Sequence, residues 1–162
     1  MNIREQHSPA TTVDPPPPPS PDEAHRRPPG VSDDLVDAVG KVSEALEWVE
    51  RARGRLYDFH QMLGRADLLL GEAVDALADA GATDQAARLD EAVVGRNVLE
   101  GRWTFQIMEE FDDGYWADFR REERRIRDEL MDGKRHIFES EMKERRRSRG
   151  RPDHEARPAT GS

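Results

Sequence analysis

A long series of apolar residues, spaced alternately four and three apart, constrains this chain more than any other feature. The series begins at Leu35 and ends at Leu77, with Arg53, His60 and Asp67 in the places where apolar residues are missing. This spacing puts all the members along one stripe of an α-helix, where they can pack against another helix as in a coiled coil. The sequence therefore predicts one long helix with a coiled-coil-like seam.

Local signals give the expected helix boundaries. Ser32 precedes two aspartates, a combination that caps a helix and complements its dipole, so the first helix is predicted over residues 33–80. Gly81 is suited to the position just after a helix end. Further helices are expected over residues 84–112 and 115–148. No stretch alternates with a period of two, so the predicted fold class is all-α.

The arrangement of these helices has two alternatives, a long antiparallel helical hairpin or a three-helix bundle. In a hairpin that reverses at residue 82, residue i faces roughly residue 164 minus i. This rule places Trp48 near Trp116 and brings Phe59 towards Phe105. We prefer the hairpin to a single rod because it gathers most of the aromatic residues into one layer.

The hairpin leaves the end of the third helix without an intrachain partner beyond about residue 131. Ile137, Phe138 and Met142 lie in that part and need burial. Either the chain folds back at Gly114 to make a three-helix bundle, or a second copy covers these residues, and we favour the bundle together with a dimer. The sequence does not decide whether the helix continues through Gly114.

The two ends of the chain are predicted to be disordered tails around a helical domain, residues 32–148. Residues 1–31 contain five consecutive prolines, Pro15–Pro19, which exclude a helix and favour an extended arm. Residues 149–162 lack apolar residues at helical spacing and are predicted to form a basic tail.

Composition limits the functional classes. The net charge is -9, and the chain has no cysteine, which excludes disulfides and thiolate chemistry. No apolar run approaches the roughly twenty residues of a membrane span, and no secretory signal follows the first methionine, so we expect a cytoplasmic protein without a membrane partner. The 22 arginines against 3 lysines indicate a GC-rich bacterial source.

The polar residues within the seam are the candidate site. They are spaced seven apart and share one line of the helix. We interpret them as polar layers that set the register; the alternative is a pocket for a polar or anionic small molecule, oriented by His60 and Asp67. The hairpin rule adds residues from the returning chain, and the candidate set is Arg53, His60, Asp67, Arg96, Asn97, Gln106 and Glu110.

Metal and catalytic chemistry have little support in the sequence. No Glu-x-x-His pair occurs, although di-metal sites in helical bundles use this motif. No nucleophile motif or glycine-rich phosphate loop is present. We therefore expect no enzyme activity, no cofactor and no metal ligands; a metal-binding bundle that uses the polar residues of the seam remains an alternative function.

A basic segment near the C-terminus is the second candidate contact surface. It could bind nucleic acid phosphates, or it could complement the helix dipole and an acidic neighbour. No aromatic residues are interleaved for base stacking, so a nucleic-acid accessory role is the weaker alternative. The segment consists of Lys143, Arg145, Arg146, Arg147, Arg149 and Arg151.

These features together predict a non-catalytic helical interaction or scaffold protein. Its expected partner is a second copy of the chain, forming a dimer, or another helical protein. The alternatives are a small-molecule- or metal-binding bundle and a nucleic-acid accessory protein.

Overall fold

The computed structural model describes residues 21–156, and this part of the chain is built from helices and contains no strand. The all-α prediction is confirmed for these residues. The proline run Pro15–Pro19, which carries the prediction of an extended arm, and the last residues, 157–162, lie outside the described part.

The first long helix, α1, spans Asp33–Asp79 and contains 47 residues, so it is about 70 Å long at 1.5 Å per residue. The Ser32 side chain caps it by accepting a hydrogen bond from the backbone N–H of Leu35, at 3.2 Å. Gly81 follows its end with φ of 86°, the left-handed conformation that favours glycine. Between residues 21 and 156, neither α1 nor any other helix is both long and apolar enough to cross a membrane.

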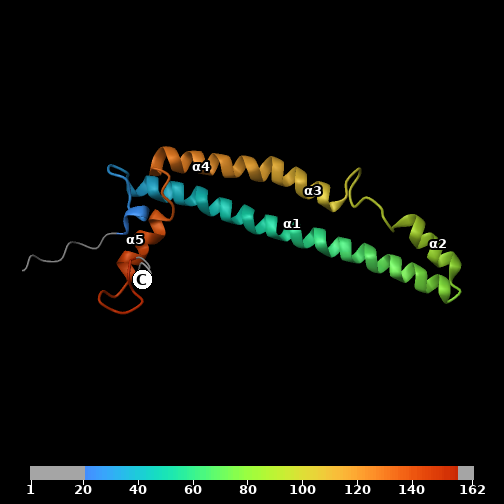
Figure 1. Cartoon of the computed structure of the whole chain (residues 1–162). Helices are drawn as coiled ribbons and strands as arrows, with labels where there is room; N and C mark the ends of the chain where they lie inside the picture. The colour runs from blue at the N-terminus through green and yellow to red at the C-terminus, as the bar shows by residue number, and fades with distance from the viewer. Residues whose placement is uncertain (1–20, 157–162) are drawn as a thin grey trace, which may run out of the picture.

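The chain then returns along α1 in several helical pieces (Figure 1). The first piece, α2, spans Thr83–Ala92, and α3 follows at Thr104–Phe111. A π-helical turn, Asp112–Trp116, joins α3 directly to α4, Ala117–Met131. Each of α2, α3 and α4 contacts α1, so the residues that pack against the seam come from three separate helices.

The predicted helix over residues 84–112 is interrupted between α2 and α3. Gly95 and Gly101 adopt φ of 67° and 70°, a left-handed conformation that ends a helix. Leu99 and Arg102 exchange backbone hydrogen bonds of 3.1 and 3.0 Å and form a tight turn. These residues therefore form a loop between α2 and α3 that runs beside α1 (Figure 1), and the helix resumes only at α3.

The predicted helix over residues 115–148 also differs from the structure. The chain stays helical through Gly114, because the π-helical turn links α3 to α4. It breaks later, at Asp132 and Gly133, which have φ of 51° and 71°. The N–H of Gly133 donates to the carbonyl of Arg127 at 3.2 Å, as in a glycine-terminated helix. A separate short helix, α5, spans Ile137–Arg146 and contacts α1.

The main core is small and lies where α1 begins, α4 ends and α5 starts. It consists of Val36, Val39, Met131 and Ile137. Ile137 is thus covered by its own chain, whereas Phe138 and Met142 stay partly exposed. Ala86 is the fifth buried apolar residue of the described chain. Few apolar side chains are therefore fully removed from water in a single copy.

The segment before α1 is ordered where it is described, although the sequence assigns residues 1–31 to a disordered arm. A 3-10 turn spans Glu23–His25. Arg27 then binds the Glu141 carboxylate of α5 through two hydrogen bonds, of 2.8 and 2.7 Å, and also pairs with Asp33. Glu141 and Asp33 together raise the pKa of Arg27. Residues 21–32, which we call the strap, therefore attach α5 to the start of α1.

We expect Arg27→Ala to release α5. Bidentate arginine–carboxylate pairs are among the strongest side-chain hydrogen bonds, and this pair is mostly shielded from solvent. Amide hydrogen exchange of residues 137–146 should become about tenfold faster, while the centre of α1 is unaffected. Arg26→Ala is the control, since the Arg26 side chain pairs with exposed Glu23. Equal exchange in the two variants would contradict this role for the strap.

Candidate functional site

Each polar residue of the α1 seam has a partner on the returning chain. Arg53 binds the Asp112 carboxylate through Nε and Nη2, at 2.7 Å each. The Tyr57 hydroxyl donates to the same carboxylate at 3.0 Å, and the guanidinium lies over the Trp116 ring, 4.2 Å from its centroid. Arg53 is thereby held on several sides, and hydrogen bonds from Arg53 and Tyr57 lower the pKa of Asp112.

Glu110, which the hairpin rule places opposite Arg53, binds Arg102 instead, with an Nε–Oε1 distance of 2.6 Å. Thr104 and Asp112 are eight residues apart and differ by about 80° around the helix axis, whereas Glu110 is rotated by at least about 120° from each of them. The hairpin rule counted residues along the chain and did not include this rotation.

His60 lies next to Thr104, as the hairpin rule expects. Nδ1 of His60 and Oγ1 of Thr104 are 2.7 Å apart, and Thr104 is buried. Gln106, the other expected neighbour, accepts a hydrogen bond from the Trp103 backbone N–H at 2.8 Å instead. Thr104 and Gln106 therefore have different roles: the first contacts α1, and the second stabilises the start of α3.

Asp67 holds the loop between α2 and α3 against α1. Its carboxylate accepts a hydrogen bond from the backbone N–H of Gly95 at 2.8 Å. Arg96 and Asn97 line a cavity of about 690 Å³ beside Asp67, a size within the range of small-molecule sites. The cavity has Leu63 and Leu70 on its α1 side, so a ligand there would meet mostly apolar helix surface.

Chemically, this row of pairs can set the register between α1 and the returning chain. Arg53, His60 and Asp67 each already bind a group of the same chain. No cluster of three or more histidine, cysteine, aspartate or glutamate residues suited to a metal ion occurs within residues 21–156. The geometry therefore resembles polar layers in a helical interface more than a reactive centre.

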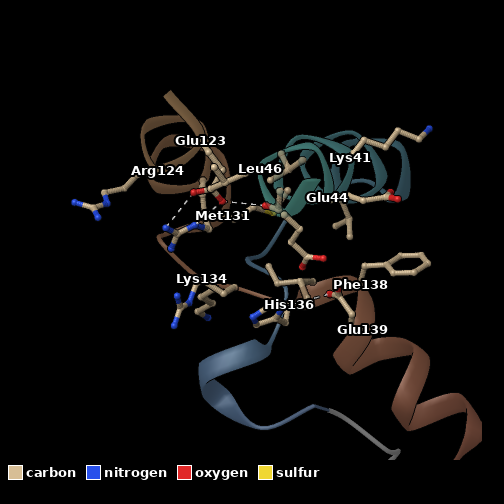
Figure 2. A pocket seen from close by; sticks show the side chains of 18 of the residues that line it. Lys41, Glu44, Leu46, Glu123, Arg124, Met131, Lys134, His136, Phe138 and Glu139 are labelled. Atoms are coloured by element: carbon tan, nitrogen blue, oxygen red, sulfur yellow. Dashed lines mark hydrogen bonds and ion pairs between the residues drawn. The ribbon is translucent and has the colours of Figure 1, made fainter. Parts of the chain in front are cut away.

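A second hollow, of about 650 Å³, lies between α1, α4 and the start of α5 (Figure 2). Glu123 on its wall accepts hydrogen bonds from Ser43 at 2.9 Å and from Arg127 at 3.1 Å. Met131 lies between α4 and α1, and Phe138 points away from it. This hollow is the space left where the three helices diverge, and the buried carboxylate on its wall, Glu123, has hydrogen-bond partners within the chain.

The basic segment is only partly free. Lys143, Arg145 and Arg146 form the last turn of α5, where positive charge complements the helix dipole. Arg147 binds Glu144, with an Nη2–Oε2 distance of 2.7 Å. Within the segment Glu144 therefore offsets the charge of Arg147, whereas Arg145, Arg149 and Arg151 are exposed.

A different surface of α1 is apolar and uncovered over most of its length. Trp48 is 61% exposed and Met62 is 63% exposed. The residues of this surface alternate spacings of three and four and are all exposed. We call it the outer face; it consists of Ala45, Trp48, Ala52, Arg55, Phe59, Met62, Ala66, Leu69, Ala73 and Ala76.

Sequence reasoning missed the outer face although its signal was present. Each member precedes a seam residue by one position, as Trp48 precedes Val49 and Met62 precedes Leu63. The outer face is therefore a second heptad series, rotated by about 100° from the first. The hairpin rule placed Trp48 near Trp116 and Phe59 towards Phe105, whereas both side chains are exposed on the outer face.

Comparisons with known proteins add no relative: no protein-family model matches the sequence, and neither a curated protein nor a solved structure matches it.

Proposed function

We propose that this chain is a non-catalytic helical interaction protein that binds a partner helix along the outer face of α1. The observation that carries this proposal is the outer face itself, a heptad series with large apolar residues exposed over about six helical turns. A strict three-and-four spacing is the pattern of a coiled-coil contact. Scattered exposed apolar residues would not keep this spacing.

The size of the core supports a role that requires a partner. Only five apolar residues of the described chain are buried, while Trp48, Phe59, Met62 and Leu69 remain in contact with water. Full burial of one such side chain contributes about 1.5–3 kcal/mol. A partner helix would therefore add a large share of the apolar contacts that stabilise α1.

The polar layers support the same proposal from the other side of α1. Arg53, His60 and Asp67 hold α3, the π-helical turn and the loop in a defined position. Such layers set the register of helices at some cost in stability. They would keep α1 straight and its outer face regular, which a helical partner requires.

Photo-cross-linking tests the proposal. We expect p-benzoylphenylalanine at Met62 to give a protein adduct when the chain is irradiated in the cells that express it. The same probe at Gln61, which is exposed but lies beside the outer face, should give at least about tenfold less adduct, because the two positions are about 100° apart around the helix. Equal yields, or no adduct from position 62, would contradict the proposed function.

A further inference from the structure

We propose that the partner of the outer face is a second copy of the chain, with the two α1 helices antiparallel and related by a two-fold axis near residue 61. This inference rests on the proposed function, because it names the partner for the same surface. It follows from three properties of α1: the charges beside the outer face, the sizes of the residues within it, and the row of aromatic residues on the neighbouring helix.

The charged residues beside the outer face of one α1 are complementary to the same residues of a second, antiparallel α1. Arg51, Asp58, Arg65 and Glu72 each precede an outer-face residue by one position and lie on the side away from α3 and α4. In an antiparallel pair centred near residue 61, Arg51 lies beside the partner's Glu72. Asp58 lies beside the partner's Arg65. The two-fold axis repeats both pairs, so these four residues form four pairs of opposite charge at the centre of the helix, whereas Glu44 on the same flank lies beside the partner's Asp79 near the helix ends.

The same register places large residues opposite small ones. Trp48 lies opposite the partner's Ala73, and Leu69 lies opposite the partner's Ala52. At the centre, Phe59 meets the partner's Met62. Alternating large and small side chains lets the layers of a helical interface interdigitate.

Arg55, the charged member of the face, lies opposite the partner's Ala66, which leaves room for its side chain. Its guanidinium already binds Asp58 at the edge of the face, with an Nη1–Oδ2 distance of 3.0 Å. The charge can therefore stay at the rim of the interface while the alkyl part of the side chain packs inside.

A parallel pair in register fits these residues poorly. Arg55 would meet the partner's Arg55, two like charges in the contact layer, and Trp48 would meet the partner's Trp48. In a parallel coiled coil, one flank of the contact face meets the opposite flank of the partner. The flanking charges would then face the partner's apolar seam residues instead of opposite charges. The charge and size patterns therefore select the antiparallel arrangement.

The helix beside α1 widens the same surface. Asp112, Trp116 and Arg120 contact Arg53 and Glu50 of α1. The residue immediately before each of these three is aromatic, and the three aromatic residues form a row. Ring centroids of neighbours in this row are 6.0 Å apart for the first pair and 5.9 Å apart for the second. The two helices are antiparallel, so residues that precede the contact residues by one lie on the same side of the pair. The aromatic row therefore adjoins the outer face; it consists of Phe111, Tyr115 and Phe119.

Cysteine pairing tests the register, because the chain has no natural cysteine. We expect a mixture of the single variants Ala52→Cys and Leu69→Cys to form a disulfide-linked dimer of the two under mild oxidation. Either variant alone should stay unlinked. Residue 52 and the partner's residue 52 would be about 25 Å apart along the axis, whereas a disulfide requires Cα atoms within about 7 Å.

The control pair is Glu47→Cys with Asp75→Cys. In the proposed dimer, residue 47 lies at nearly the same height along the axis as the partner's residue 75, but both residues lie off the outer face. This mixture should stay largely unlinked. Linkage of Ala52→Cys to itself would indicate a parallel pair and overturn the inference. Equal linkage in the control mixture, or none in the test mixture, would also overturn it.

Sedimentation equilibrium gives an independent measurement that does not depend on a disulfide. The natural chain should be a dimer, and Met62→Glu should raise its dissociation constant by about 30-fold or more, as expected for a central apolar contact. Gln61→Glu should leave the constant unchanged, and circular dichroism should show that both variants remain helical. A monomer at all concentrations that still forms a Met62 photo-adduct, with another protein or with its own residues 1–20, would overturn the inference. In that case the mass of the adduct tests the proposed function separately: an adduct with another protein supports a helical partner, and an adduct within the same chain contradicts it.

Discussion

Met131→Ala is expected to destabilise the fold by about 3 kcal/mol, within the range observed for truncation of buried methionine and leucine side chains. Met131 is 2% exposed, the lowest fraction among the buried apolar residues. Its side chain joins α4 to Val36 and Val39 of α1 and to Ile137 of α5. Truncation leaves a cavity where three helices meet, and few other buried contacts are available to compensate.

The measurement is the free energy of unfolding from urea denaturation, at matched protein concentration because association adds to apparent stability. Leu68→Ala is the control: Leu68 is 64% exposed and lies off the outer face. That variant should change the free energy by no more than about 0.5 kcal/mol. If both variants cost the same, the main core would not be where the structure places it.

Asp112→Asn is expected to cost about 2 kcal/mol, because it leaves the Arg53 guanidinium without its charged partner. Both side chains of the pair are only partly buried, so we expect less than for a fully enclosed ion pair. The variant also weakens the acceptor for the Tyr57 hydroxyl. Asp113→Asn is the matched control, since Asp113 is exposed and should tolerate the change within about 0.5 kcal/mol.

The same pair predicts a dependence on pH. Hydrogen bonds from Arg53 hold the pKa of folded Asp112 below its ordinary value of 3.8. A depressed pKa stabilises the fold above the unfolded-state pKa, and this contribution disappears as the pH falls through the folded-state value. The difference in unfolding free energy between the natural chain and Asp112→Asn should therefore be constant above about pH 5 and shrink below about pH 4. A difference that does not decrease at all between pH 5 and pH 2 would exclude the charge as its cause.

The seam and its caps could be predicted because they depend on local spacing. The three-and-four periodicity from Leu35 to Leu77 gave a helix over residues 33–80, and α1 spans Asp33–Asp79. Ser32 and Gly81 mark its ends as expected. Counting back from the turn also placed Thr104 beside His60. These features need only helix geometry and one reversal.

The breaks and the outer face were missed because tertiary contacts decide them. Gly95 and Asp132 occur within helical patterns, and Gly95 adopts a left-handed conformation and donates its N–H to Asp67 of α1. The strap follows from an ion pair between residues 27 and 141, which are 114 positions apart. Trp48 was placed near Trp116 by counting residues along the chain, with only one hydrophobic series on α1 in view. The structure has two such series, and one of them is exposed.

The π-helical turn at Asp112–Trp116 has a consequence for how α1 and its neighbour stay in contact. An α-helix turns about 100° per residue, so the eight residues from Thr104 to Asp112 already rotate its contact direction by about 80°. Two straight helices would soon lose contact, and coiled coils avoid this by winding around each other. The π-helical turn takes up extra residues with less rotation. It therefore changes the rotational phase between α3 and α4, and Glu123 and Met131 of α4 lie against α1.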